Sequence, residues 1–243
     1  MHKATHFFTS SIGKKVIMAV TGLILIGFVI GHLIGNLQLF AAPEVINSYA
    51  HFLQSMGPGL WAVRLFLLAA LVLHVWAAVQ LTIENRKARP RGYDYDHTIQ
   101  ASYASRTMRW SGFIVLAFLL FHLAHFTVRI GPYDKYNEMT ATITHQGQQI
   151  EVLDVHSMMV IGFQSPLVSL FYIVAIGLLS IHLSHGIASM FQSVGLLTNR
   201  WRNGLANAAI AISVLYFIGN ALIPLSVLFG WVDIQNPSLI ASL

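Results

Sequence analysis

The chain has 243 residues, of which 56% are hydrophobic and 9% are charged, and its mean hydropathy is +0.65. A soluble domain usually carries roughly 25% charged residues, so this composition excludes a soluble enzyme and indicates an integral membrane protein. The absence of cysteine excludes disulfides, thiolate-bound zinc and thiolate-bound iron–sulfur clusters. The formal charge is +5, and 12 histidines supply most of the metal-binding or titratable chemistry.

Five apolar stretches are each long enough to cross a bilayer core of about 30 Å as a helix. None of them contains Asp or Glu, and they cover residues 16–40, 61–83, 110–130, 166–191 and 205–231. Turn and helix-start signals separate them, such as Pro58-Gly59 and Ser165-Pro166. We therefore predict an all-α integral membrane protein with five transmembrane helices in a single domain over residues 1–243.

Basic residues indicate the orientation of these helices. Only Arg64, Arg129 and Lys135 lie on one predicted side of the membrane. The other side holds the remaining 11 of the 14 Lys and Arg: Lys3, Lys14, Lys15, Arg86, Lys87, Arg89, Arg91, Arg106, Arg109, Arg200 and Arg202. By the positive-inside rule, the N-terminus is cytoplasmic and the C-terminus is external. The charges form clusters at helix ends rather than one basic face, so nucleic acid is not an expected partner.

The longest external connection, residues 131–163, is mostly polar. Within it, Thr140–Thr144 and Gln149–Leu153 alternate in polarity on either side of Gln146-Gly147. This pattern is typical of a β-hairpin, but an irregular loop fits it equally well.

Six histidines fall inside the apolar stretches, and four of the five stretches carry at least one. An ionisable residue inside a membrane span usually has a function. The alternative for any single one is a neutral imidazole that hydrogen-bonds a neighbouring helix. The six are His32, His74, His122, His125, His182 and His185.

Two of these histidines share a level near the external side. A helix rises 1.5 Å per residue, so from the cytoplasmic side His32 lies ~24 Å beyond Val16 and His122 lies ~18 Å beyond Trp110. Histidines at one level on the first and third helices suit the two axial positions of one haem iron.

Two further histidines share a level nearer the cytoplasm. Counted from the external side, His74 lies ~20 Å beyond Trp61 and His182 lies ~24 Å beyond Pro166. A second bis-histidine haem would fit here, in a bundle formed by the first four helices. With both axial positions filled, the iron is suited to electron transfer rather than to oxygen binding.

The remaining two histidines, His125 and His185, each follow a partner by three residues. The pairs His122/His125 and His182/His185 therefore lie on one helical face each, a spacing that suits zinc or copper. No acidic or thiolate partner accompanies them within the spans, so a hydrogen bond to a haem propionate or a quinone carbonyl is the favoured alternative.

Several short motifs give the chain a family resemblance that covers all five stretches. It resembles the single-chain, five-helix, dihaem cytochrome b subunit of bacterial succinate:quinone oxidoreductases and fumarate reductases. The motifs are Ser10-Ser11-Ile12-Gly13-Lys14-Lys15, Thr21-Gly22-Leu23, Gly31-His32, Leu73-His74, Phe121-His122-Leu123 and Ile181-His182-Leu183-Ser184-His185-Gly186. The resemblance implies that His122 and His182, rather than His125 and His185, are ligands. It also implies the pairing of His32 with His122 at an outer haem and of His74 with His182 at an inner haem.

The resemblance further implies a respiratory complex II of the tricarboxylic acid cycle in a bacterial cytoplasmic membrane. This chain would carry two b haems and no residue that acts on succinate. A flavoprotein with FAD and an iron–sulfur protein would bind its cytoplasmic side, with menaquinone as the expected acceptor and oligomers of the complex allowed. Two rivals stay open: a cytochrome b subunit of another dehydrogenase or of a fumarate reductase, and a histidine-rich metal or proton transporter without haem.

The quinone and propionate contacts have only candidate residues. An apolar cleft with hydrogen-bond donors is the chemistry a quinone needs. Interfacial anchoring and solvated positive-inside charge explain most of the same residues equally well. Near the cytoplasm the candidates are Ser10, Ser11, Lys14, Lys15, Arg86, Arg106, Arg109, Trp110 and His185; near the external side they are His125, His51, Gln38 and Asn36.

Overall fold

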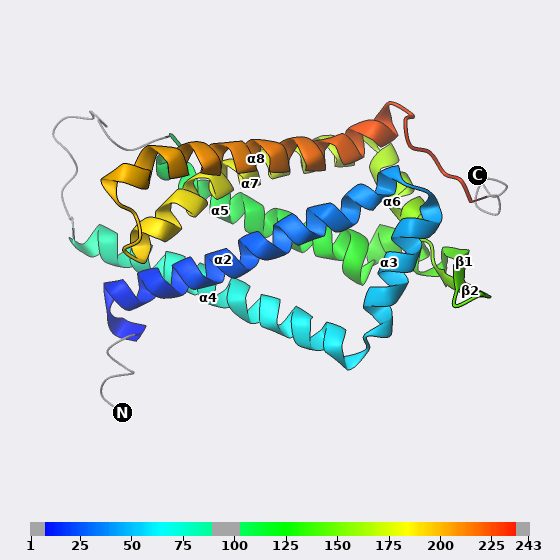
Figure 1. Cartoon of the computed structure of the whole chain (residues 1–243), viewed down its shortest axis with the longest axis horizontal. Helices are drawn as coiled ribbons and strands as arrows, with labels where there is room; N and C mark the ends of the chain where they lie inside the picture. Colours follow the sequence, from blue (N-terminus) through cyan, green and yellow to red (C-terminus); the bar gives the residue numbers. More distant parts are fainter. Residues whose placement is uncertain (1–7, 89–102, 237–243) are drawn as a thin grey trace. The chain divides into compact units, whose positions relative to one another are not determined.

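The computed structural model describes residues 8–88 and 103–236 (Figure 1). Three of the basic residues that indicate the orientation, Lys3, Arg89 and Arg91, lie outside this described part.

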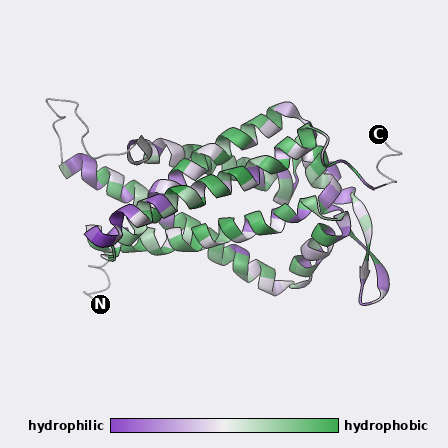
Figure 2. Ribbon diagram, turned by 45° about the horizontal axis from the view of Figure 1, so that its top comes forward, coloured by the Kyte–Doolittle hydropathy of each residue, from purple (hydrophilic) through white to green (hydrophobic). Residues whose placement is uncertain are grey.

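Long apolar helices dominate the described part of the chain, and five of them are long and apolar enough to cross a membrane. This confirms the predicted five-helix, predominantly α-helical membrane architecture. Figure 2 shows that apolar residues predominate along these helices. They are α2 (Ser11–Asn36, continued by η1, Leu37–Phe40), α4 (Pro58–Ala88), α5 (Tyr103–His122, continued by the π-helix η2, Leu123–Val128), α7 (Pro166–Ser193) and α8 (Asn199–Leu228).

Internal contacts divide the chain into two compact units. The first comprises Met1–Val29, Trp61–Arg109 and Ile181–Ser213. The second comprises Ile30–Leu60, Trp110–Ser180 and Val214–Leu243. The predicted inner pair, His74 and His182, belongs to the first unit, and the predicted outer pair, His32 and His122, belongs to the second. Each predicted pair therefore lies within one unit.

The second unit also contains short elements that connect the long helices. They are α3 (Pro43–Ser55), the 3₁₀ helix η3 (Gly131–Glu138), β1 (Thr140–His145), β2 (Gln148–Leu153) and α6 (Val155–Gln164). Contacts join α3 to η1, to both strands and to α6, and η2 to η3 and α6. The sequence did not predict α3 or α6, because neither has the length or continuous apolar character of a span.

The two strands form the hairpin that the sequence left open. β1 and β2 pair antiparallel, with Ile143 opposite Ile150. The two turn residues, Gln146 and Gly147, both have positive φ, 50° and 78°. Two consecutive positive φ angles are the signature of a two-residue type I′ turn, whose twist matches that of the strands. The hairpin is thus confirmed, and Ile143 is its most deeply buried side chain.

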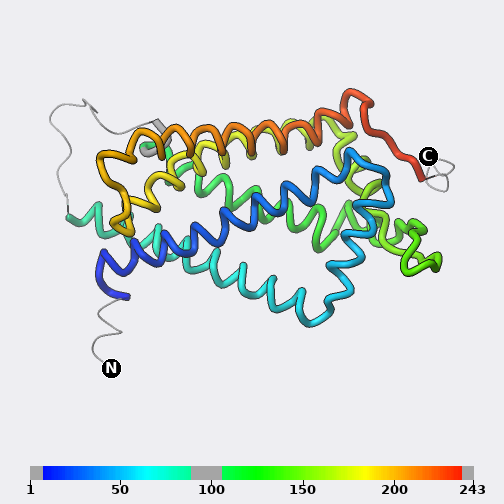
Figure 3. Tube along the Cα trace, viewed as in Figure 1, coloured from blue at the N-terminus to red at the C-terminus, as the bar shows by residue number. Residues whose placement is uncertain are grey.

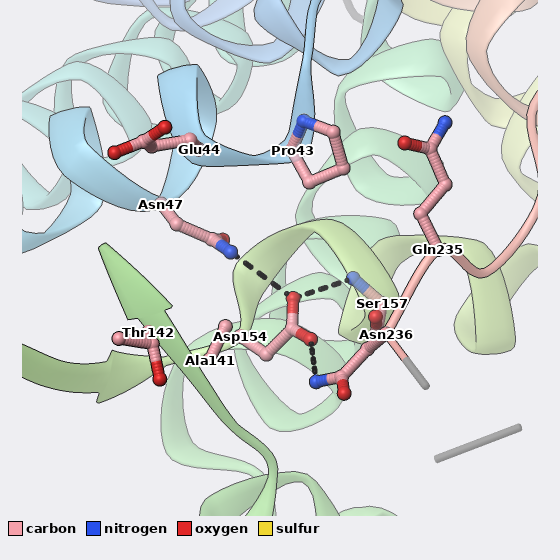
Figure 4. A pocket seen from close by; sticks show the side chains of 9 residues that line it. All are labelled: Pro43, Glu44, Asn47, Ala141, Thr142, Asp154, Ser157, Gln235 and Asn236. Atoms are coloured by element: carbon pink, nitrogen blue, oxygen red, sulfur yellow. Dashed lines mark hydrogen bonds between the residues drawn. The ribbon is translucent and has the colours of Figure 1, made fainter. Parts of the chain in front are cut away.

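A buried carboxylate joins α3, α6 and the chain after α8. Asp154 is the N-cap of α6 and accepts a hydrogen bond from the backbone N of Ser157 at 3.0 Å. It also accepts from Asn47 Nδ2 at 3.2 Å and from Asn236 Nδ2 at 2.7 Å (Figure 4). Asn236 in turn donates to the carbonyl of Thr140 at 2.9 Å, which explains why the trace after α8 runs towards the hairpin in Figure 3.

Replacing Asp154 by Ala should destabilise this junction. The change removes the N-cap of α6 and leaves the buried amide of Asn47 without its acceptor, a loss of about 1–3 kcal/mol. Hydrogen exchange in α6 and the hairpin should accelerate, whereas exchange in the middle of α2 should not. The control is Glu138→Gln, which alters an exposed carboxylate of η3. Unchanged exchange in Asp154→Ala would contradict the assigned role.

Candidate functional site

The predicted outer histidines meet in the second unit. His32 comes from α2 and His122 is the last residue of α5. Their ring centroids are 5.7 Å apart, and the ring planes are nearly perpendicular, at 85°. If one metal ion lay between the two rings, each metal–nitrogen bond would be about 2 Å long, and each ring centre would lie about 1 Å beyond its nitrogen. The two ring centroids would then be roughly 6 Å apart. The two rings therefore have about the spacing that one iron between them requires.

The second ring nitrogen of His122 has a partner on α7. The Tyr172 hydroxyl lies 3.4 Å from His122 Nδ1 and 2.9 Å from His125 Nδ1. A hydrogen bond at Nδ1 orients an imidazole and leaves Nε2 as the ligating atom. His122 thus faces His32 on one side and Tyr172 on the other.

His125 shares Tyr172 and Phe126 with His122 but is otherwise enclosed by different residues. It is fully buried, stacks on Phe126 with ring centroids 3.9 Å apart, and packs on Tyr133 at 4.3 Å. Its position follows from η2, whose π-helical turn begins immediately after His122 and ends at Arg129 with a left-handed φ of 54°. His125 therefore lies in an aromatic enclosure rather than beside His32.

The predicted inner histidine of the second helix, His74, has its ring fixed in the first unit. Its Nδ1 lies 3.2 Å from the carbonyl oxygen of Met18 and 3.2 Å from Thr21 Oγ1. A carbonyl only accepts, so Nδ1 carries the proton and Nε2 keeps its lone pair for a ligand. Gly22 permits this contact, because a Cβ there would lie 3.3 Å from the ring of His74.

His182 of α7 completes the inner pair. It belongs to the same unit as His74, and its side chain interacts electrostatically with those of His74 and His185. Gly186, one turn further on, has open space where a Cβ would project. Two imidazoles on α4 and α7, one with its Nε2 lone pair available, fit the donor set of a bis-histidine haem.

The histidines that lie three residues apart, His122/His125 and His182/His185, do not form a metal-binding cluster. Over residues 8–88 and 103–236, no group of three or more His, Cys, Asp or Glu has the geometry to hold a metal ion. The His122 ring faces His32, whereas the His125 ring stacks on Phe126.

The candidate residues at the start of α2 are held by other protein groups. Ser10 Oγ accepts from the backbone N of Gly13 at 3.0 Å, which caps the helix. Lys14 is buried and forms an ion pair with Glu84 of α4, and Ser11 Oγ donates to the same carboxylate at 3.2 Å. Glu84 escaped the sequence analysis because the predicted span ends at residue 83, whereas α4 continues to Ala88.

The other candidates lie at helix ends or on short elements. Arg86, Arg109 and Trp110 are exposed, as is Arg106 near the start of α5. His51 of α3 packs against His145 of β1, with ring centroids 5.3 Å apart. None of these contacts tests a role in binding a quinone or a propionate.

A cavity of about 300 Å³ lies where α3, the hairpin, α6 and the segment after α8 that contains Gln235 and Asn236 meet (Figure 4). Its lining includes Glu44, Asn47, Asp154 and Asn236. Both carboxylate oxygens of Asp154 already accept hydrogen bonds from protein N–H groups, so they have a structural role in this wall.

Next to this junction, α6 buries a second titratable group. His156 is 1% exposed, and neither ring nitrogen has a hydrogen-bond partner within the described residues. Burial lowers the pKa of His156 below its ordinary value of 6.5, and the Asp154 carboxylate partly opposes this effect. The ring is therefore neutral at physiological pH.

The sequence analysis missed Thr21 and Tyr172, which position the candidate ligands. A tyrosine inside an apolar span is itself a signal, because its buried hydroxyl requires a hydrogen-bond partner. Thr21 belongs to the motif Thr21-Gly22-Leu23, but the sequence does not indicate its contact with His74, since a threonine in a helix often bonds its own backbone, as Thr21 does to Ile17 at 2.7 Å.

No protein-family profile, curated protein or solved structure matches the chain.

The Lys14–Glu84 ion pair should be needed for stability. Glu84→Gln leaves the buried Lys14 ammonium without its counter-charge, so the melting temperature in detergent should fall. The double variant Lys14→Met with Glu84→Gln should recover much of the loss, because no unpaired charge remains. Lys15→Met, which changes an exposed neighbour, is the control. An equal loss in Lys15→Met would contradict a specific pair.

Burial of neutral His156 should make α6 sensitive to acid. The unfolded segment binds a proton below about pH 6.5, whereas folded His156 binds it only at lower pH. The contribution to stability is thus complete above pH 6.5 and declines as the pH falls below that value. Intrinsic amide exchange slows as the pH falls, so the quantity to compare is the protection factor, which relates each exchange rate to that of an unstructured peptide at the same pH. The protection factors of α6 should fall between pH 7.5 and 5.5, and His156→Leu should weaken this dependence. An identical pH dependence in His156→Leu would refute it.

Proposed function

We propose that this chain is the membrane-anchoring dihaem cytochrome b subunit of a succinate:quinone oxidoreductase. In that role it passes electrons from an iron–sulfur subunit to a quinone. His32 and His122 would hold one b haem, and His74 and His182 the other. The observation that carries the proposal is the pairing of His32 with His122, whose ring centroids are 5.7 Å apart on different membrane-spanning helices.

The nitrogen chemistry of the ligands supports this assignment. An axial imidazole must offer Nε2 as a lone pair while Nδ1 is held by the protein. His74 meets this requirement through the Met18 carbonyl, and the Tyr172 hydroxyl lies within hydrogen-bonding distance of His122 Nδ1. Bound at these sites, the haems would supply two one-electron couples.

The proposed orientation places the N-terminus in the cytoplasm of a bacterium, following the positive-inside distribution. The soluble partners would then be a flavoprotein with FAD and an iron–sulfur protein on the cytoplasmic side. This partner assignment depends on the sequence motifs from Ser10 to Gly186. It also accounts for the lack of cysteine, because the clusters would lie in the partner.

A histidine-rich transporter for a metal or for protons is less well supported. Such a site for a divalent cation usually converges three or more ligands. Within residues 8–88 and 103–236, no group of three or more His, Cys, Asp or Glu has the geometry to hold a metal ion, whereas the rings of His32 and His122 lie side by side.

The test is haem content. The purified protein should show b-type absorption in a reduced-minus-oxidised spectrum, with about two haems per chain. His74→Ala or His182→Ala should remove one haem, and His32→Ala or His122→Ala should remove the other, because each iron loses one axial ligand. The content should fall from about two haems to about one in each variant.

His125→Ala is the matched control for His122→Ala, since it removes an imidazole three residues away on the same segment. It should retain both haems. Full haem content in His122→Ala would contradict the ligand assignment, and absence of b-type absorption from the unaltered protein would overturn the proposal. Co-purification of a flavoprotein and an iron–sulfur protein would separate this function from that of another membrane dehydrogenase.

A further inference from the structure

The buried His125 has no role in the proposed ligand set, yet it makes a specific hydrogen bond. Its Nδ1 lies 2.9 Å from the hydroxyl of Tyr172, and that hydroxyl lies 3.4 Å from Nδ1 of His122. The two histidines are thus connected through one oxygen atom. Its other ring nitrogen, Nε2, is buried and has no hydrogen-bond partner among the described residues.

The polarity of this chain of hydrogen bonds can be deduced. A hydroxyl has one hydrogen, so it donates to one imidazole and accepts from the other. If His125 donated from Nδ1, its Nε2 would be a bare lone pair among aromatic rings, whose negative faces disfavour it. The favoured arrangement therefore has His125 protonated at Nε2 and accepting from Tyr172 at Nδ1. Tyr172 then accepts from the Nδ1–H of His122.

We propose that His125 and Tyr172 are positioning residues for His122. His125 accepts a hydrogen bond from the Tyr172 hydroxyl. This bond directs a lone pair of the Tyr172 oxygen towards His122. This holds His122 in the tautomer and orientation that offer Nε2 to an iron atom. The inference rests on the proposed function, because it assigns His122 as the axial ligand.

The packing around His125 keeps this arrangement fixed. Gly162 brings α6 against the ring: a Cβ there would lie 3.1 Å from His125 Nε2 and 2.8 Å from the ring of Phe126. Phe163 packs on Tyr172 at 4.9 Å, with perpendicular rings. Because His125 is fully buried among these rings, its packing favours the orientation that directs Nδ1 at the hydroxyl.

The experiment measures the midpoint potential of each haem and its ferric electron paramagnetic resonance signal in the purified, haem-loaded protein. Tyr172→Phe removes the acceptor for His122 Nδ1–H, which makes this imidazole a weaker donor to ferric iron. The midpoint potential of the haem that His122 would hold should rise, and its ferric signal should change. The other haem should keep its potential and its signal.

Variants of His125 separate positioning from packing. His125→Leu removes the acceptor for the Tyr172 proton and should shift the same haem in the same direction, by less than Tyr172→Phe. His125→Gln restores a carbonyl acceptor and should return the potential towards the wild-type value. Tyr133→Phe, which alters another tyrosine packed on His125, is the control and should change neither haem.

Several results would overturn the inference. One is a Tyr172→Phe protein with full haem content whose potentials and ferric signals are unaltered. A second is a Tyr172→Phe protein in which both haems shift equally or both are lost. A third is a His125→Gln protein that behaves like His125→Leu. Each of these can occur in a protein with two haems. They are therefore distinct from a failure of the proposed function, in which the unaltered protein binds no haem.

Discussion

The governing constraint on this protein is that a bilayer core offers no water to satisfy a polar side chain. An imidazole has two nitrogens, and within a membrane span a nitrogen without a partner in the protein or in a ligand is costly. At His74 the Met18 carbonyl accepts a hydrogen bond from Nδ1–H, and Nε2 keeps its lone pair. At His122 a tyrosine hydroxyl lies beside the corresponding nitrogen. The same requirement that makes these residues costly in a membrane thus prepares them to bind a ligand.

In the connecting segments of the second unit, a buried carboxylate likewise has its hydrogen bonds satisfied by protein groups. Asp154 is buried, and three N–H donors from α3, α6 and the segment after α8 satisfy its carboxylate. This arrangement links segments that are far apart in the sequence and holds α6, a largely buried helix, against α3. Since α6 carries Gly162, the junction also determines how closely the chain encloses His125.

The sequence predicted the features that depend on composition and helix rise. It identified the five apolar helices, and the rise of 1.5 Å per residue placed His32 and His122 at one level, where their rings meet. The hairpin was recognised as one of two alternatives from Gln146-Gly147. The sequence did not predict α3 or α6, because such short helices are stabilised by tertiary contacts rather than by an apolar repeat. The roles of Tyr172 and Glu84 depend on side-chain direction and on where α4 ends, and neither can be read from residue spacing.

The π-helix η2 has a consequence for how this region tolerates change. A π turn advances through a smaller angle per residue than an α turn, so it increases the angular offset between His122 and a residue three positions later. The different environments of His122 and His125 thus depend on the number of residues between Leu123 and Val128 as well as on their identity. Point substitutions leave that number intact, whereas an insertion or deletion of one residue would rotate every side chain that follows. The positions of these side chains are therefore as sensitive to the length of this short segment as to its residue types.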